Sequence, residues 1–174
     1  MEQDERRLRL ESLFAAHAPV VLAYARRRTD SATADDVLSD VFVVAWRRLE
    51  QVPQDPVPWL LACARNILAD AQRGERRRAE LIERLRAGVP SIEPGPKLND
   101  RALADALASL AERDREVLLL IAWDGLSAEQ AATVLGCSRR ALSMRLHRAR
   151  KRFSAALADA GRPEPRPTME TCND

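Results

Sequence analysis

One proline-rich segment constrains the fold more than any other feature of this sequence. Residues 87–100 read AGVPSIEPGPKLND and hold three prolines and two glycines, whereas the segments on both sides are rich in helix-forming residues. A stretch of this composition predicts a flexible linker. The chain of 174 residues therefore divides into two halves, residues 1–86 and 101–160, each large enough for only a small core.

Both halves carry the composition and the spacing of helices, and no alternating apolar pattern predicts a strand. The expected fold class is all-α, with two small helical domains joined by the linker. The expected helices span residues 6–28, 33–50, 59–86, 101–111, 113–123, 128–135 and 139–160, followed by a disordered tail at 161–174. Pro19 predicts a kink or a break in the first helix, and Gly74 leaves open whether the third helix continues or restarts. A capping box at Thr33 and Asp36 is expected to start the second helix.

The second half contains the pattern of a helix-turn-helix. Gly125 is placed to end one helix, and Ser127 with Gln130 forms a capping box for a short second one. Gly136 then predicts a tight turn, after which Ser138 caps a longer helix. A short helix, a glycine-containing turn and a longer helix are typical of a DNA-binding helix-turn-helix.

The longer helix has one apolar stripe and one basic surface. Leu142, Leu146, Ala149 and Phe153 recur at helical spacing and predict the buried stripe. No acidic residue occurs from 138 to 153, although the net charge of the whole chain is only +2. Such local segregation of charge favours DNA binding over an ordinary solvated face, which mixes both signs. The expected DNA-binding residues are Ser138, Arg139, Arg140, Ser143, Met144, His147, Arg148 and Lys151.

The helix expected at 33–50 allows two interpretations. Acidic residues gather near its start, and valines at positions 37, 41 and 44 can face a core. Leu38, Phe42 and Trp46 recur on a second face, which is either an exposed ridge for a protein partner or part of a central helix in a bundle.

The helix that begins at Trp59 also has two interpretations. Asn66, Asp70 and Arg73 share one face, and their side chains suit base edges beside a stacking Trp59. The alternative is a salt-bridged surface with Trp59 in the core.

Several functional classes are not expected. Cys63, Cys137 and Cys172 are widely spaced and predict reduced thiols rather than a disulfide or a zinc site. We find no catalytic constellation, cofactor motif or metal-ligand spacing, so the chain is not expected to be an enzyme. Without a membrane-spanning apolar run or a signal-peptide pattern, a cytoplasmic location is expected.

Taken together, the two halves resemble a bacterial RNA polymerase sigma factor of the extracytoplasmic-function (ECF) group. The resemblance covers residues 13–157 and rests on an ordered set of runs: LFAAHAPVVLAYARRR, ADDVLSDVFVVAWRRL, WLLACARNILADAQRGERRR and LASLAERDREVLLLIAWDGLSAEQAATVLGCSRRALSMRLHRARKRF. It implies a first domain at 1–86 that docks on core polymerase and reads the −10 promoter element, and a second domain at 101–160 that reads the −35 element.

The resemblance also implies partners and residue roles. The β′ clamp helices of the polymerase would contact Asp36, Ser39, Asp40, Phe42, Val43 and Trp46, although Ser39 replaces a glutamine that is common in the family. The −10 region would engage Trp59, Asn66, Asp70, Arg73, Arg76 and Arg77. The β flap and an anti-sigma factor are further expected partners. The alternative is a stand-alone helix-turn-helix regulator that binds a palindromic site as a dimer without polymerase.

Overall fold

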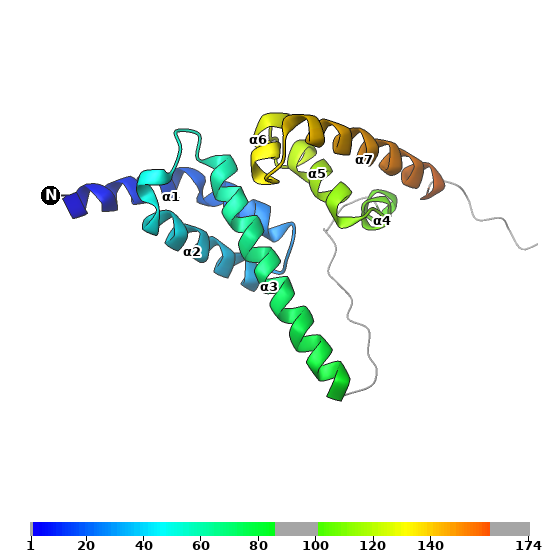
Figure 1. Ribbon diagram of the computed structural model, residues 1–174, viewed down its shortest axis with the longest axis horizontal. Coiled ribbons are helices and arrows are strands. Elements are labelled where there is room, and N and C mark those ends of the chain that lie inside the picture. Colours follow the sequence, from blue (N-terminus) through cyan, green and yellow to red (C-terminus); the bar gives the residue numbers. More distant parts are fainter. Residues whose placement is uncertain (1, 86–100, 161–174) are drawn as a thin grey trace, which may run out of the picture.

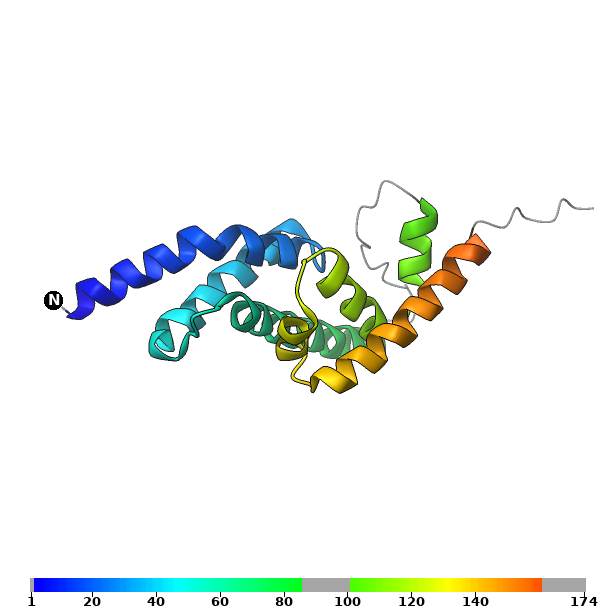
Figure 2. The same cartoon turned by 90° about the horizontal axis from the view of Figure 1, so that it is seen from above.

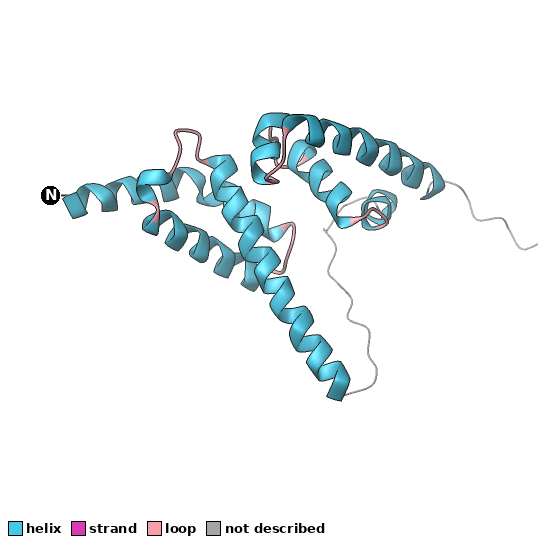
Figure 3. Ribbon diagram, viewed as in Figure 1, coloured by secondary structure: helices cyan, strands magenta, loops and turns pink. Residues whose placement is uncertain are grey.

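The computed structural model describes residues 2–85 and 101–160. Within these ranges every regular element is a helix, which confirms the expected all-α class (Figure 3). The expected linker at 87–100 and the expected tail at 161–174 lie outside the described residues.

The first half is a bundle of three helices, α1 (Glu2–Arg26), α2 (Ser31–Arg47) and α3 (Val57–Leu85) (Figure 1). A short 3-10 helix, η1 (Leu49–Gln51), begins the connection between α2 and α3. Figure 1 shows the C-terminal part of α3 projecting beyond the bundle. Helix α3 continues through Gly74 rather than restarting there.

The structure changes two specific predictions about how helices of the first half begin and continue. Helix α1 runs through Pro19 as one element, which excludes the break and leaves the kink as the remaining expectation. Helix α2 begins at Ser31 because Asp30 caps it: the Asp30 carboxylate accepts a hydrogen bond from the Thr33 backbone N–H. This hydrogen bond and a second one, which the Thr33 hydroxyl donates to Asp30 Oδ2, lower the pKa of Asp30. The expected capping box at Thr33 and Asp36 is therefore wrong, since Thr33 is already inside the helix.

Helix α2 lies at the centre of the first half. Val37 and Val41 are buried as expected and Val44 is half-buried, but Phe42 is also buried, with 6% of its surface exposed. Its ring packs edge-on against Phe14 of α1, with ring centroids 4.8 Å apart. An exposed ridge through Phe42 is therefore wrong, and the interpretation of α2 as a central bundle helix is correct.

The second half contains α4 (Arg101–Ala108), α5 (Glu112–Ala122), α6 (Ala128–Val134) and α7 (Arg139–Ala160). The capping box of Ser127 and Gln130 is present, and the Ser138 hydroxyl accepts from the Ala141 N–H at 3.2 Å. Gly125 and Gly136 adopt φ values of +67° and +59°, a region that L residues rarely occupy. The helix-turn-helix formed by α6 and α7 is thus confirmed.

Helix α7 packs its expected apolar stripe inward. Leu142 and Ala149 are fully buried, and Leu146 and Phe153 pack against the cores. The second half has a small core of its own, in which Leu107, Leu110 and Leu118 contact this stripe. An ion pair between Asp114 and Arg152 joins α5 to α7.

The main core is shared by both halves. One buried cluster contains Val41 and Leu61 of the first half together with Val117, Leu120 and Leu142 of the second. Helix α6 lies beside the start of α3, as Figures 1 and 2 both show. The sequence predicted two helical units on a tether, and the structure joins them through a common apolar core.

Candidate nucleic-acid interface

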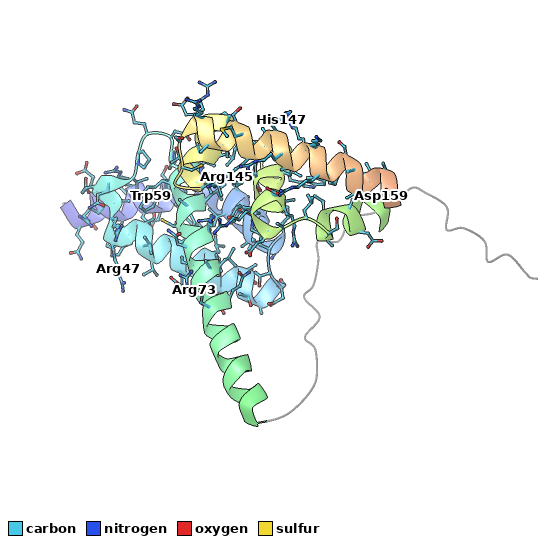
Figure 4. The ribbon with its side chains drawn as sticks, turned by 45° about the vertical axis from the view of Figure 1, so that its right-hand side comes forward. Arg47, Trp59, Arg73, Arg145, His147 and Asp159 are labelled. Carbon is cyan, nitrogen blue, oxygen red and sulfur yellow. The ribbon has the colours of Figure 1, made fainter. Side chains whose placement is uncertain are left out.

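One face of α7 is open to solvent and carries the residues expected to bind DNA. Arg140, Ser143, Met144, His147 and Arg148 are exposed, and Met144 exposes 57% of its surface. Four of them, Ser143, Met144, His147 and Arg148, line one shallow open groove. Figure 4 shows His147 on the outer side of α7 and Arg145 on the opposite side. We call the exposed set of Arg140, Ser143, Met144, His147 and Arg148 the recognition face.

The recognition face and its surroundings carry cations that are free to meet phosphates. Within residues 2–85 and 101–160, no acidic side chain pairs with Arg139, Arg140, Arg148 or Lys151. Ser138 and Arg139 are exposed at the start of the helix, next to the turn. Helix α7 therefore has a buried apolar face and an exposed basic face with no acidic partner. Such a helix suits insertion into a major groove, where side chains reach base edges and the DNA backbone.

A second polar face lies on α3. Asn66, Asp70 and Arg73 are all exposed on this helix, and Figure 4 shows Arg73 about midway along it. Asp70 and Arg73 form an ion pair with each other. This pair leaves the other N–H groups of the exposed Arg73 guanidinium open to a further partner. Arg76 and Arg77 belong to α3, but their side chains lie outside the described residues.

Trp59 stands at the start of α3, next to the second half. Its indole is half-buried and packs against the shared core. Together with Asp55 and Pro58, it lines an open groove that Glu129 and Thr133 of α6 also line. The Gln130 amide donates a hydrogen bond to Asp55 Oδ2 at 2.9 Å. Trp59 is thus partly covered rather than presented to solvent.

The outer surface of α2 is acidic with one apolar side chain. Asp36, Ser39, Asp40 and Val43 are exposed and share one face by their spacing, and Val43 exposes 46% of its surface. Trp46 is half-buried beneath the guanidinium of Arg6, which lies 5.2 Å from the ring centroid. Of the expected polymerase contacts, Asp36, Ser39, Asp40 and Val43 are therefore accessible, and Phe42 is not.

The cysteines offer no sign of a reactive site. Cys63 and Cys137 are free and half-buried, and burial raises the pKa of the Cys63 thiol, which disfavours the nucleophilic thiolate. Cys172 lies outside the described residues. In the part of the chain that the structure describes, no group of three histidine, cysteine or carboxylate side chains could hold a metal ion. No described helix is long and apolar enough to cross a membrane.

Comparison with known proteins identifies both halves. The family description "Sigma-70 region 2" matches residues 13–78, and "Sigma-70, region 4" matches residues 100–153. The ECF RNA polymerase sigma factor SigL of Mycobacterium tuberculosis is 33% identical over 160 residues, which cover 87% of this chain and 90% of SigL. This chain belongs to the ECF RNA polymerase sigma factors. As a sigma factor, it binds core RNA polymerase and directs promoter recognition and transcription initiation.

Other similar proteins agree with the assignment of this chain to the sigma factors. The sigma factor CnrH of Cupriavidus metallidurans is 36% identical over 162 residues, covering 83% of this chain and 84% of CnrH. The solved structure of CnrH in complex with the cytosolic domain of CnrY matches with a TM-score of 0.61 and 30% identity, over 88% of this chain and 89% of that one. The fold also matches the sigma factor RpoE of Bartonella quintana, at a TM-score of 0.66 and 24% identity over 87% and 98% of the two chains. The alternative of a stand-alone dimeric regulator is not favoured.

Proposed function

We propose that the ECF sigma factor divides its work among three surfaces. The recognition face of α7 reads the −35 element, the start of α3 with its exposed polar face reads the −10 element, and the outer face of α2 docks on the β′ clamp helices of core polymerase. The single observation that carries this proposal is the recognition face, because it joins a helix-turn-helix scaffold to an acid-free exposed surface.

Physical chemistry explains why two DNA-reading surfaces suit one chain. A single bidentate base contact contributes about 1–3 kcal/mol of discrimination, so one small module binds its site weakly. When two modules are held on a common scaffold, binding of the first module to its site places the second at a high effective concentration near its own site. Polymerase supplies that scaffold, and the chain itself supplies no chemistry, in keeping with the non-enzymatic role of sigma factors.

The role of the recognition face is tested by comparing two cations of α7. We expect Arg140→Ala to reduce discrimination at one position of the −35 element by about 1–3 kcal/mol, because Arg140 reaches base edges. The matched change, Lys151→Ala, is expected to weaken binding to all sequences equally, as loss of a phosphate contact does. Equilibrium binding of holoenzyme to promoter variants measures both effects. A uniform loss with Arg140→Ala would reassign it to the DNA backbone.

We further propose that a partner protein sequesters the free chain in the cytoplasm, where polymerase acts. The support is that solved relatives are complexes: CnrH with the cytosolic domain of CnrY, and RpoE with the anti-sigma factor NepR. Purification of the tagged chain from its native cells should yield such a partner in stoichiometric amounts. Recovery with polymerase subunits alone, under all growth conditions, would contradict sequestration.

A further inference from the structure

One acidic side chain of the second half is buried beside α7. Asp114 lies in the first turn of α5, and its Oδ2 accepts a hydrogen bond from Arg152 Nη1 of α7. The two side chains form an ion pair, in which Asp114 exposes 10% of its side-chain surface and Arg152 exposes 61%. The carboxylate is therefore held inside the second half, and the guanidinium reaches back to it from the surface of α7.

Arg152 lies at the edge of the recognition face. It follows Arg148, a member of that face, by four residues, and side chains with this spacing are neighbours on a helix. On its other side is Ala149, three residues earlier, which is fully buried in the apolar stripe. Arg152 therefore stands between the surface that meets DNA and the surface that meets the core. A free arginine at this edge would suit the phosphates that flank a major groove.

The ion pair distinguishes Arg152 from the other cations of α7. Within residues 2–85 and 101–160, no acidic side chain pairs with any other arginine or lysine of α7. A cation that neutralises a DNA phosphate releases counterions, and this release adds affinity for every sequence. Asp114 already neutralises Arg152, so a phosphate that approached this pair would also meet a second negative charge. The pair thus removes one arginine from the charge that α7 offers to DNA.

We propose that Asp114 withholds Arg152 from DNA and thereby limits the affinity of the sigma factor for sequences that lack its promoter. This inference rests on the proposed role of the recognition face in DNA binding. Phosphate contacts add affinity for every sequence, whereas contacts to base edges add it only for the correct one.

Lower sequence-independent affinity has a clear use in promoter search. A genome offers a vast excess of nonspecific sites, and these compete with the promoter for the protein. One phosphate contact fewer weakens binding to all of them. Asp114 therefore acts on DNA binding without touching DNA, through an arginine of the neighbouring helix.

The test frees Arg152 by replacing the carboxylate with an amide of the same size, in the variant Asp114→Asn of the full chain. Fluorescence anisotropy measures binding to a labelled random-sequence DNA duplex over a series of salt concentrations. We expect tighter binding at low salt, and a slope of log affinity against log salt that is steeper by about 0.9, the value for one more neutralised phosphate. The gain in affinity over the natural chain should therefore shrink by about 3.5-fold when the salt concentration rises about fourfold.

Two controls separate the release of Arg152 from a change in net charge. Glu112→Gln removes an exposed carboxylate from the same turn of α5 and frees no arginine, so its slope should stay close to that of the natural chain. The double variant Asp114→Asn Arg152→Gln lacks the freed cation and should also keep the natural slope. A slope for Asp114→Asn no steeper than that for Glu112→Gln would overturn the proposal. A double variant with a shallower slope would show that Arg152 already binds phosphate, and one with a steeper slope would show that the gain does not come through Arg152; either result contradicts the proposal.

The variant Arg148→Gln distinguishes this proposal from the function on which it rests. Arg148 belongs to the recognition face, so its loss should make the slope shallower by about 0.9. An unchanged slope would refute DNA binding by the recognition face itself. A shallower slope, together with no effect of Asp114→Asn, would refute the withholding of Arg152 alone.

A further variant covers the case in which Asp114→Asn does not fold, as circular dichroism would reveal. Arg152→Gln leaves the buried carboxylate in place, and the glutamine amide can still donate a hydrogen bond to it. This variant should bind the random-sequence duplex with the natural slope, in contrast to Arg148→Gln. A slope as shallow as that of Arg148→Gln would show that Arg152 contacts DNA and would overturn the proposal.

Discussion

Tyr24 is the residue that reports the packing of the two halves most directly. It is the single tyrosine of the chain and is fully buried, and its hydroxyl donates to Glu116 across the interface. Burial raises the pKa of Tyr24 above the ordinary value near 10. Because the folded state favours the neutral phenol, this linkage supports stability below pH 10 and is lost as the pH rises above it.

An alkaline titration tests this environment. We expect the absorbance of tyrosinate to appear only as the helices unfold, measured together by ultraviolet absorbance and circular dichroism. The variant Tyr24→Phe, which lacks the ionisable group, should lose less stability between pH 10 and pH 12 than the natural chain. Ionisation with a midpoint near pH 10 and an intact helix signal would show that Tyr24 is accessible, and hence that the interface is open in solution.

At the residue level, helical periodicity predicted which side chains of α7 are exposed, but it did not predict which residues pair with each other. The apolar stripe of α7 and the exposed recognition face follow from helical periodicity, because alternate faces of one helix are fixed by its geometry. The ion pair of Arg28 with Asp124 could not be predicted in this way, since 96 residues separate them in the sequence. Only the packing of the two halves brings the two charges together, because Arg28 lies just beyond the end of α1 and Asp124 just beyond the end of α5.

Helix α2 is the element whose interpretation changes most once its packing is known. The sequence offered Leu38, Phe42 and Trp46 as an exposed ridge, but burial of Phe42 removes that ridge. What remains outside is an acidic face with Val43. Periodicity alone could not decide between these interpretations, because both faces of α2 carry apolar residues and only the position of α1 selects the buried ones.

The outer face of α2 makes a testable prediction about polymerase. We expect Asp40→Ala Val43→Ala to weaken binding to core polymerase by roughly tenfold or more, because an interface loses both a charge and an exposed apolar anchor. The matched control is Leu8→Ala Glu11→Ala on α1, which removes an exposed leucine and an exposed acid at the same spacing. Binding is measured by a titration with purified core enzyme. Equal affinities for the two double variants would remove α2 from the docking surface.

Helix ends were predictable where side-chain chemistry defines them. Ser127 with Gln130 and Gly136 occupy the positions expected from capping and from positive φ. The two departures have different physical reasons. Helix α1 continues past Pro19 within the bundle, and at the start of α2 Asp30 supplies the cap that was assigned to Thr33.

At the scale of the whole molecule, the decisive feature is the core that both halves share. Val117 and Leu120 of α5 are fully buried in one cluster with Val41 and Leu61 of the first half. A linker composition predicts independent domains, and nothing in residues 87–100 indicates that the segments it joins pack together. The packing of the two halves on a common core is therefore information that only the structure supplies.

The central claim is that this chain gives core polymerase its promoter specificity, and transcription in vitro tests it most directly. Purified bacterial core enzyme is mixed with a pool of promoter fragments, with and without the full chain. The account predicts specific initiation only when the chain is added, at fragments that share one −35 and one −10 element. Absence of initiation, together with tight binding to a palindromic site without polymerase, would contradict it.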